Sequence, residues 1–269
     1  MESGFSRIGA IRLKADATYN GGHQVRSAVW AIALVAIVAS WRGASDVQTI
    51  DAAPRRLLFV GNSLTAAHDL PGVVAAMAAS LGWPLECERV TFDGYSLEDH
   101  WNEGSARRAI ARGGWSTVVL QQGPSALPES RTLLVEYVRR FDADARRIGA
   151  RTALFMVWPA SARQSDFDGV KTSYASAARA VNGLLLPAGE AWQAAWRLDG
   201  RMSLYGPDGF HPAPSGSYLA ALVILQRLFG RSVERAPTTV TPGGQRPVRM
   251  AIPDADAAVL KRAAAQMGW

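Results

Sequence analysis

Apolar runs typical of buried strands alternate with helix-like stretches from about residue 57 onward. Continuous apolar runs predict strands buried on both faces, and one run with alternating apolar residues predicts a strand near a sheet edge. These runs are 57–60, 117–120, 152–157 and 184–186, with the alternating run at 85–91. Helical spacing of apolar residues is seen at 73–81, 129–148, 170–181, 190–196, 215–229 and 254–267. Because strands and helices alternate, we expect an α/β fold with a parallel, doubly wound sheet and right-handed crossovers.

Two stretches of the chain do not follow this alternation. Residues 97–112 are polar and contain tryptophan, and we expect them to form a surface-like segment without a strand. Residues 231–250 are rich in Pro, Thr and Arg, and we expect an irregular extension that leads to the last helix. The pattern therefore predicts one domain over 51–269, in which 231–269 form a C-terminal extension.

The first 50 residues have the pattern of a leader. Residues 1–26 are polar and mildly basic, and residues 28–39 are wholly apolar. At about 12 residues, this apolar core is short for a membrane span and has the length of a signal-peptide core. We therefore expect export to the periplasm or the extracellular space. Three alternatives stay open: an uncleaved anchor in the inner membrane, a start codon placed too early, and a buried helix of the domain. Residues 41–54 resemble a linker.

Composition and charge exclude several classes of function. The 269 residues carry a net charge of +6 and a pI near 9.9, but at most two arginines are adjacent and no basic stripe is interleaved with aromatic residues. This distribution argues against a nucleic-acid partner. Cys87 is the single cysteine, so the chain has no internal disulfide and no cysteine metal site. Motifs for zinc proteases, nucleotide binding and the α/β-hydrolase elbow are also missing, and we expect neither metal nor organic cofactor.

Two short motifs carry the candidate chemistry. Ser63 follows the first predicted strand, and ligands of parallel sheets bind beyond the carboxyl ends of the strands. A serine hydroxyl needs a base, which in turn needs a third group to orient it. His211 is the best candidate among four histidines, because Asp208 stands three residues before it in a Gly/Pro loop. A single turn could place that carboxylate on Nδ1 and leave Nε2 free for the serine hydroxyl.

These motifs resemble those of the SGNH hydrolases, also called GDSL lipases and esterases. The family's G-D-S-L block is matched by Gly61-Asn62-Ser63-Leu64, with Asn in place of Asp, and its D-x-x-H-P block is matched by residues 208–212. The resemblance spans about residues 55–230. It implies a three-layer α/β/α, flavodoxin-like fold and a Ser63, His211, Asp208 triad.

The resemblance also implies an oxyanion hole, built by three blocks of the family. Its first two donors would be the backbone N–H groups of Ser63 and Gly94. The third block departs from G-x-N-D and resembles a subgroup in which glutamine follows the third strand. Gln121 is the expected side-chain donor, with Gln122 and Ser125 as alternatives.

Together with the export that residues 28–39 predict, this resemblance implies the function of an exported serine esterase. We expect hydrolysis of small acyl esters through an acyl-enzyme, with O-acetyl groups on carbohydrate as the favoured substrate. The alternatives are a catalytically silent glycan-binding domain of the same fold and an acyltransferase. Two tryptophans near predicted strand ends, Trp101 and Trp158, could stack on sugar rings or pack in the core. We expect a small-molecule or glycan ester as the partner, and a membrane tether through residues 28–39 stays open.

Overall fold

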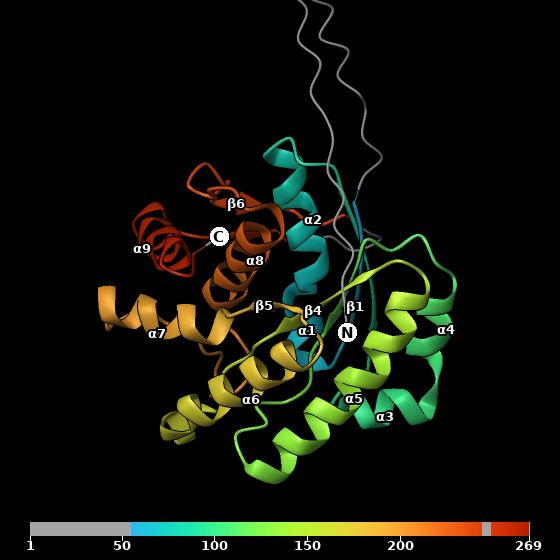
Figure 1. The fold of residues 1–269 in the computed structure, drawn as a ribbon. Coiled ribbons are helices and arrows are strands. Elements are labelled where there is room, and N and C mark those ends of the chain that lie inside the picture. Colours follow the sequence, from blue (N-terminus) through green and yellow to red (C-terminus); the bar gives the residue numbers. More distant parts are fainter. Residues whose placement is uncertain (1–54, 244–248, 269) are drawn as a thin grey trace, which may run out of the picture. The chain divides into compact units, whose positions relative to one another are not determined.

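The computed structural model of the chain describes residues 55–243 and 249–268 (Figure 1). The predicted leader of residues 1–50, with its signal peptide or anchor, lies outside these residues. No helix in the described ranges combines the length and the apolar character that a membrane span requires.

A parallel sheet of five strands forms the centre of the domain, in the order β2-β1-β3-β4-β5. The alternating strand β2 lies at one edge, as its pattern predicts, and β1 lies between β2 and β3. This order is that of flavodoxin-like folds, so the predicted three-layer α/β/α class is confirmed. The strands are β1 (Arg55–Gly61), β2 (Leu85–Thr91), β3 (Thr117–Leu120), β4 (Arg151–Phe155) and β5 (Leu184–Leu186).

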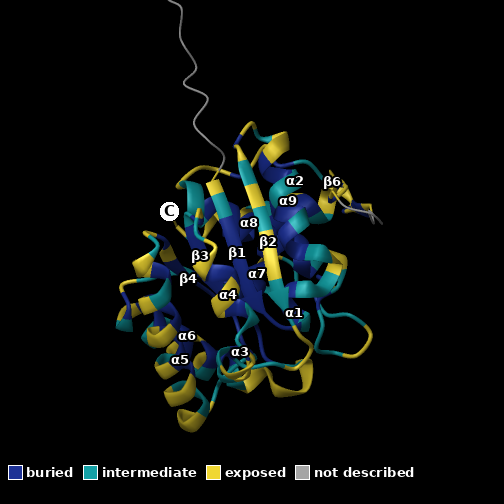
Figure 2. Cartoon of the chain, turned by 90° about the vertical axis from the view of Figure 1, so that its right-hand side faces the viewer, coloured by how far each residue is buried: buried dark blue, intermediate teal, exposed yellow. Residues whose placement is uncertain are grey.

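Helices cover both faces of the sheet (Figures 1 and 2). On one face α2 (Leu70–Ser80) packs against α8 (Pro214–Phe229), which also contacts α7 (Ala188–Leu198) and α9 (Asp254–Ala265). On the other face α5 (Pro128–Arg147) packs against α6 (Phe167–Ala180) and against two shorter helices. The continuous apolar run of β1, residues 57–60, is completely buried between these layers. Burial of one such side chain stabilises the fold by about 1.5–3 kcal/mol.

The segment at 97–112 is helical, a structure that the sequence pattern does not predict. It forms α3 (Leu97–Glu103) and α4 (Ser105–Ala111), and Gly104 separates them with a left-handed φ of 88°. Ser96 begins α3 through a capping box with Asp99. His100, expected on the surface, is fully buried, and its Nε2 donates to the carbonyl oxygen of Gly61 at 2.8 Å.

The C-terminal extension contains a small sheet of its own. Strands β6 (Thr239–Val240) and β7 (Met250–Ala251) pair antiparallel within the stretch that the pattern predicts as irregular. Two-residue strands are too short to produce a visible periodicity, which explains the difference.

Candidate active site

Ser63 lies at the carboxyl edge of the sheet, where β1 ends and the short helix α1 (Ser63–Ala66) begins. Asn62 caps that helix, because its Oδ1 accepts the backbone N–H of Leu64 at 3.1 Å. Gly61 leaves no room for a side chain, since a Cβ there would collide with the amide oxygen of Gln121 and with Thr65. The G-N-S sequence therefore builds a tight strand-to-helix turn with the serine at its outer end.

The loop before α8 presents His211 to this serine. Oδ1 of Asp208 accepts the backbone N–H groups of Phe210 and His211, each at 3.0 Å, so the loop folds back onto its own carboxylate. Oδ2 of Asp208 lies 2.5 Å from His211 Nδ1, and His211 Nε2 lies 2.9 Å from Ser63 Oγ. The structure thus brings three side chains together, although Ser63 and His211 are 148 residues apart in sequence.

The hydrogen bonds of this loop also set the charge of Asp208. The bond from the His211 side chain, together with those from the backbone of Phe210 and His211, lowers the pKa of Asp208 from 3.8 to about 2. The carboxylate is therefore ionised throughout the neutral and mildly acidic range. An ionised carboxylate on Nδ1 fixes the imidazole tautomer that leaves Nε2 free to accept a proton.

A second loop, between β4 and α6, holds the His211 loop in place. Trp158 Nε1 donates to the carbonyl oxygen of Phe210 at 3.1 Å, and Tyr205 Oη donates to that of Pro159 at 2.7 Å. Trp158 is fully buried and stacks on Trp192, with the ring centroids 3.6 Å apart. It cannot stack on a sugar ring in this position, so the core alternative is correct for Trp158. Its part in holding the loop has no signature in the sequence.

Gln121 lies directly beneath the serine turn, with its amide fully engaged. Its Oε1 accepts the backbone N–H of Asn62 at 2.9 Å and the hydroxyl of Thr65 at 2.7 Å. Its Nε2 donates to Asn62 Oδ1 at 3.0 Å and to the carbonyl oxygen of Gln122 at 2.5 Å. An amide nitrogen has two hydrogens, and both are used here. The expected donation from Gln121 to an oxyanion is therefore not available in this arrangement.

Other donors near the turn remain free. The backbone N–H groups of Ser63 and Gly94 take part in no hydrogen bond among the described residues. Gly94 is exposed, with a φ of 73°, in a loop that Asn62 Nδ2 holds through the carbonyl oxygen of Tyr95 at 3.0 Å.

Gln122 retains a free donor, in contrast to Gln121. Its Oε1 accepts the backbone N–H of Leu97 at 3.0 Å, and its Nε2 donates to Ser125 Oγ at 2.7 Å. One Nε2 hydrogen thus has no acceptor within the described part of the chain.

No group of three or more His, Cys, Asp or Glu residues in the described part of the chain is arranged to hold a metal ion.

A cavity of about 310 Å³ has Phe210, the residue before His211, in its wall, whereas neither Ser63 nor His211 lines it. Its lining is mostly apolar, with an Arg163–Asp166 ion pair at 2.7 Å on one side. The other lining residues are Pro124, Ser125, Ala126, Leu127, Ser130, Pro159 and Ala160.

Comparisons with known proteins place the fold. No family model matches the chain, and no curated protein matches it. Among solved structures, a protein from Slackia heliotrinireducens that is provisionally described as an SGNH hydrolase is 27% identical, with a TM-score of 0.57, over 65% of this chain and 99% of that one.

Two further structures are similar in fold at lower identity. A DUF4886 family protein from Bacteroides uniformis is 19% identical, with a TM-score of 0.65, over 79% of this chain and 94% of that one. A variant of Axe2, an acetyl-xylooligosaccharide esterase from Geobacillus, is 13% identical, with a TM-score of 0.54, over 65% of this chain and 95% of that one. With its five-stranded parallel sheet and flanking helices, the chain has the fold of the SGNH hydrolase superfamily.

Proposed function

We propose that the protein is a serine esterase with Ser63 as nucleophile, His211 as general base and Asp208 as the group that orients the base. The observation that carries this proposal is the unbroken chain of hydrogen bonds from Asp208 Oδ2 through the imidazole to Ser63 Oγ, at 2.5 and 2.9 Å. Both distances lie within hydrogen-bond reach, as proton transfer requires.

The proposed reaction proceeds through an acyl-enzyme. Ser63 Oγ attacks the ester carbonyl carbon while its proton passes to His211 Nε2, and the carbonyl oxygen becomes an oxyanion. When the tetrahedral intermediate collapses, the C–O bond to the alcohol breaks and His211 returns the proton to the departing alkoxide. Water then attacks the acyl-enzyme by the same route and releases the acid together with free Ser63.

The proposed oxyanion hole combines backbone and side-chain donors. The free backbone N–H groups of Ser63 and Gly94 are two of them, and the unpaired Nε2 hydrogen of Gln122 is the third. We assign Gln121 to positioning, because its four hydrogen bonds tie the serine turn to the end of β3. Donors fixed in advance meet the developing charge without reorganisation.

Small acyl esters on carbohydrate are the proposed substrates. The cavity that Phe210 lines has room for a small group, and the described residues contain no long apolar insertion that would cover a fatty chain. One protein of similar fold acts on acetylated xylooligosaccharides, which shows that this fold can accept such esters. Export, with or without retention of residues 28–39 as a tether, would place the enzyme where glycans are found.

A catalytically silent glycan-binding domain is the second candidate, favoured by the engaged amide of Gln121. Transfer of the acyl group to an alcohol instead of water is the third, since the acyl-enzyme is common to both reactions.

Hydrolysis of p-nitrophenyl acetate by the wild type, Ser63→Ala and His211→Ala tests the proposal. Removing one member of a unit that acts together removes most of the rate, so we expect each variant to lose at least about 10³-fold in kcat. Circular dichroism and thermal unfolding of each variant serve as controls for folding. More than about a tenth of wild-type activity in either folded variant would refute the assignment. With glycerol as a competing acceptor, the ratio of acetate to acetylglycerol formed separates hydrolysis from transfer, because p-nitrophenol is released in both reactions.

A further inference from the structure

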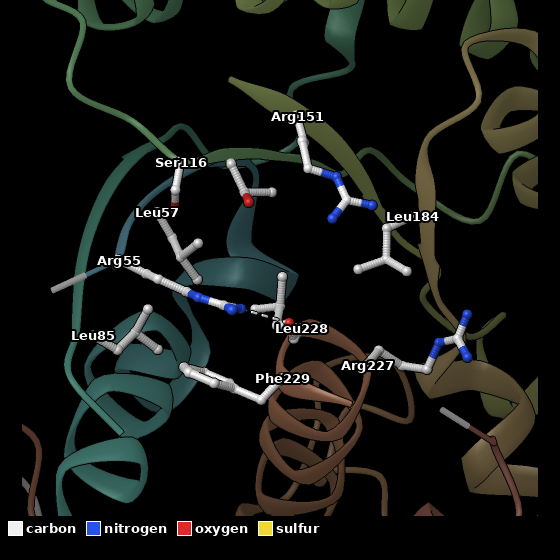
Figure 3. Close-up of a pocket in the computed structure, with 10 residues that line it drawn as sticks. Arg55, Leu57, Leu85, Ser116, Arg151, Leu184, Arg227, Leu228 and Phe229 are labelled. Carbon is white, nitrogen blue, oxygen red and sulfur yellow. Dashed lines mark hydrogen bonds between the residues drawn. The ribbon is translucent and has the colours of Figure 1, made fainter. Parts of the chain in front are cut away.

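A second cavity, of about 310 Å³, opens at the amino edge of the sheet (Figure 3). Residues at or near the start of each of the five strands of the central sheet line it, and the end of α8 closes one side. Because β1 is seven residues long, this cavity lies roughly 20 Å from the serine turn. It is therefore separate from the proposed active site.

Three arginines lie in the wall of this cavity, and no acidic residue does. They are Arg55, Arg151 and Arg227. Among the described residues, none of the three forms an ion pair with a carboxylate. The neighbouring Arg56, by contrast, pairs with Glu88 at 2.9 Å. The described part of the chain thus leaves these three positive charges unneutralised, and Figure 3 shows that the Arg227 guanidinium is turned away from the space between Arg55 and Arg151.

Hydrogen bonds hold two of these guanidinium groups while leaving most of their N–H donors free. Arg55 donates one N–H to the carbonyl oxygen of Leu228 at 2.8 Å, and Arg227 donates Nε–H to that of Leu185 at 3.2 Å. The guanidinium of Arg151 donates to no described residue, and Figure 3 shows its side chain reaching into the space across from Arg55. Each guanidinium has five N–H donors, so an anion would find several of them unoccupied.

The rest of the wall is apolar. Leu57, Leu85, Leu184 and Phe229 line the cavity, and the Arg55 guanidinium lies 4.7 Å from the centre of the Phe229 ring. The volume exceeds what a bare oxyanion fills, and the leucines offer a surface for carbon atoms. The lining thus suits a ligand with an anionic head and a small organic part.

We propose that this cavity binds the phosphate group of an organic phosphate. Guanidinium groups bind phosphate through paired N–H donors, and their positive charge does not titrate in the physiological range. The carbonyl groups at the end of α8 repel an anion slightly, but Arg55 already satisfies one of them. Two sources share this chemistry: a soluble phosphate ester and the headgroup of an anionic phospholipid.

The position of Arg55 in the sequence bears on whether a phospholipid headgroup could be the ligand. Arg55 begins the amino edge of the sheet and follows the predicted linker, 16 residues after Ala39. A chain of that length spans at most about 55 Å. If residues 28–39 stay in the membrane, the arginine cavity would lie within reach of lipid headgroups.

Binding of sn-glycerol 3-phosphate to the full-length chain tests the proposal. We would measure affinity by isothermal titration at constant ionic strength, for the wild type, Arg151→Gln and Arg227→Gln. Each substitution removes a charged hydrogen-bond donor, so we expect affinity to fall about tenfold or more. Arg139→Gln, which removes an exposed arginine on α5, is the matched control and should bind as the wild type does. Ester hydrolysis should stay unchanged in all three variants.

A second arm distinguishes the two sources. The full-length chain would be placed in nanodiscs of phosphatidylcholine, with or without phosphatidylglycerol, and hydrogen exchange followed at 116–118 and 226–229. Slower hydrogen exchange that requires phosphatidylglycerol and is lost in Arg151→Gln indicates a lipid headgroup as the ligand. Slower exchange that glycerol 3-phosphate causes and phosphatidylglycerol does not indicates a soluble phosphate ester. Absence of binding in both arms, or binding that Arg151→Gln and Arg227→Gln leave unchanged while both fold normally, would overturn the proposal.

Discussion

Two networks of hydrogen-bonded polar side chains meet at the serine turn. They differ in how many of their donors and acceptors have partners within the protein. Gln121 and Asn62 are almost fully buried, and every donor and acceptor of the Gln121 amide has a partner within the protein. In the other network, the side chains of His211 and Asp208 are 42% and 52% exposed, and the serine hydroxyl is the one hydrogen-bond partner of His211 Nε2 among the described residues.

This difference separates positioning from chemistry. A buried amide whose bonds are all satisfied rigidifies its surroundings, and has no group left to offer a substrate. An exposed imidazole, oriented from behind by a carboxylate, can accept a proton in front and return it to a leaving group. The buried network of Gln121 and Asn62 thus fixes the shape of the G-N-S turn. In our proposal, the exposed network of His211 and Asp208 makes Ser63 reactive.

The largest expected effect comes from Asp208→Asn, which disrupts the exposed hydrogen-bond network of His211 and Asp208. An asparagine can still hold the loop, but it no longer favours the imidazole tautomer that accepts the serine proton. We expect kcat for p-nitrophenyl acetate to fall by about 10³- to 10⁴-fold with little change in folding. A folded Asp208→Asn enzyme with near-normal kcat would show that the carboxylate does not orient the base.

Acid unfolding provides an independent check on the same residue. The pKa of Asp208 is lowered to about 2 by the bonds from His211 and Phe210, so the ionised form favours the folded state. That contribution is complete above the ordinary value of 3.8 and is lost as the pH falls toward 2. Asp208→Asn should therefore show a weaker loss of stability than the wild type between about pH 4 and pH 2.

Gln122→Ala tests the side-chain donor of the proposed oxyanion hole. Loss of one such donor typically costs about 10²- to 10³-fold in kcat, because the donor meets charge only in the transition state. The KM should change much less. An effect mainly on KM, or no effect on either constant, would mean that the hole is built from backbone N–H groups.

Gln121→Ala should give the opposite result, with a loss of stability larger than the loss of rate. The substitution leaves the buried N–H of Asn62 and the hydroxyl of Thr65 without partners, at about 1–3 kcal/mol each. Chemical unfolding in urea measures this cost. A stable Gln121→Ala variant with kcat reduced 10²-fold would return the donor role to Gln121.

The smallest expected effect concerns His100, buried beneath the turn. Burial lowers the pKa of His100 below its ordinary 6.5, so the folded state favours the neutral imidazole, although the bond to Gly61 acts in the opposite direction. The unfolded chain binds a proton below pH 6.5, and stability should therefore fall with decreasing pH, by at most about 1.4 kcal/mol per unit. His100→Asn, which can still donate to the carbonyl, should flatten this slope in urea unfolding between pH 7 and pH 5.

Strong local patterns made most of the fold predictable from the sequence. The alternating strand 85–91 and the apolar run 117–120 appear in the structure with the predicted bounds, because burial on one or both faces leaves a clear periodicity. The helices α3 and α4 were not predicted, since each is seven residues long and Gly104 interrupts their pattern. His100 was expected at the surface for the same reason.

The site was less predictable than the fold. Ser63, Asp208 and His211 each lie next to turn-forming residues, which allowed the sequence to single them out. Which way a glutamine amide points depends on partners distant in sequence, and here Asn62 and Thr65 engage Gln121 from 56 to 59 residues away. The support that Trp158 gives to the His211 loop is likewise a contact between distant segments, 52 residues apart.

Covalent labelling with a fluorophosphonate is the most direct test of an activated Ser63. Intact-protein and peptide mass spectrometry would follow the full-length chain at neutral pH. The account predicts a single adduct on Ser63 in the wild type, none in Ser63→Ala, and labelling slowed by orders of magnitude in His211→Ala, because a serine without its base is a weak nucleophile. A folded wild-type protein that takes no label, or one labelled equally fast in His211→Ala, would contradict it.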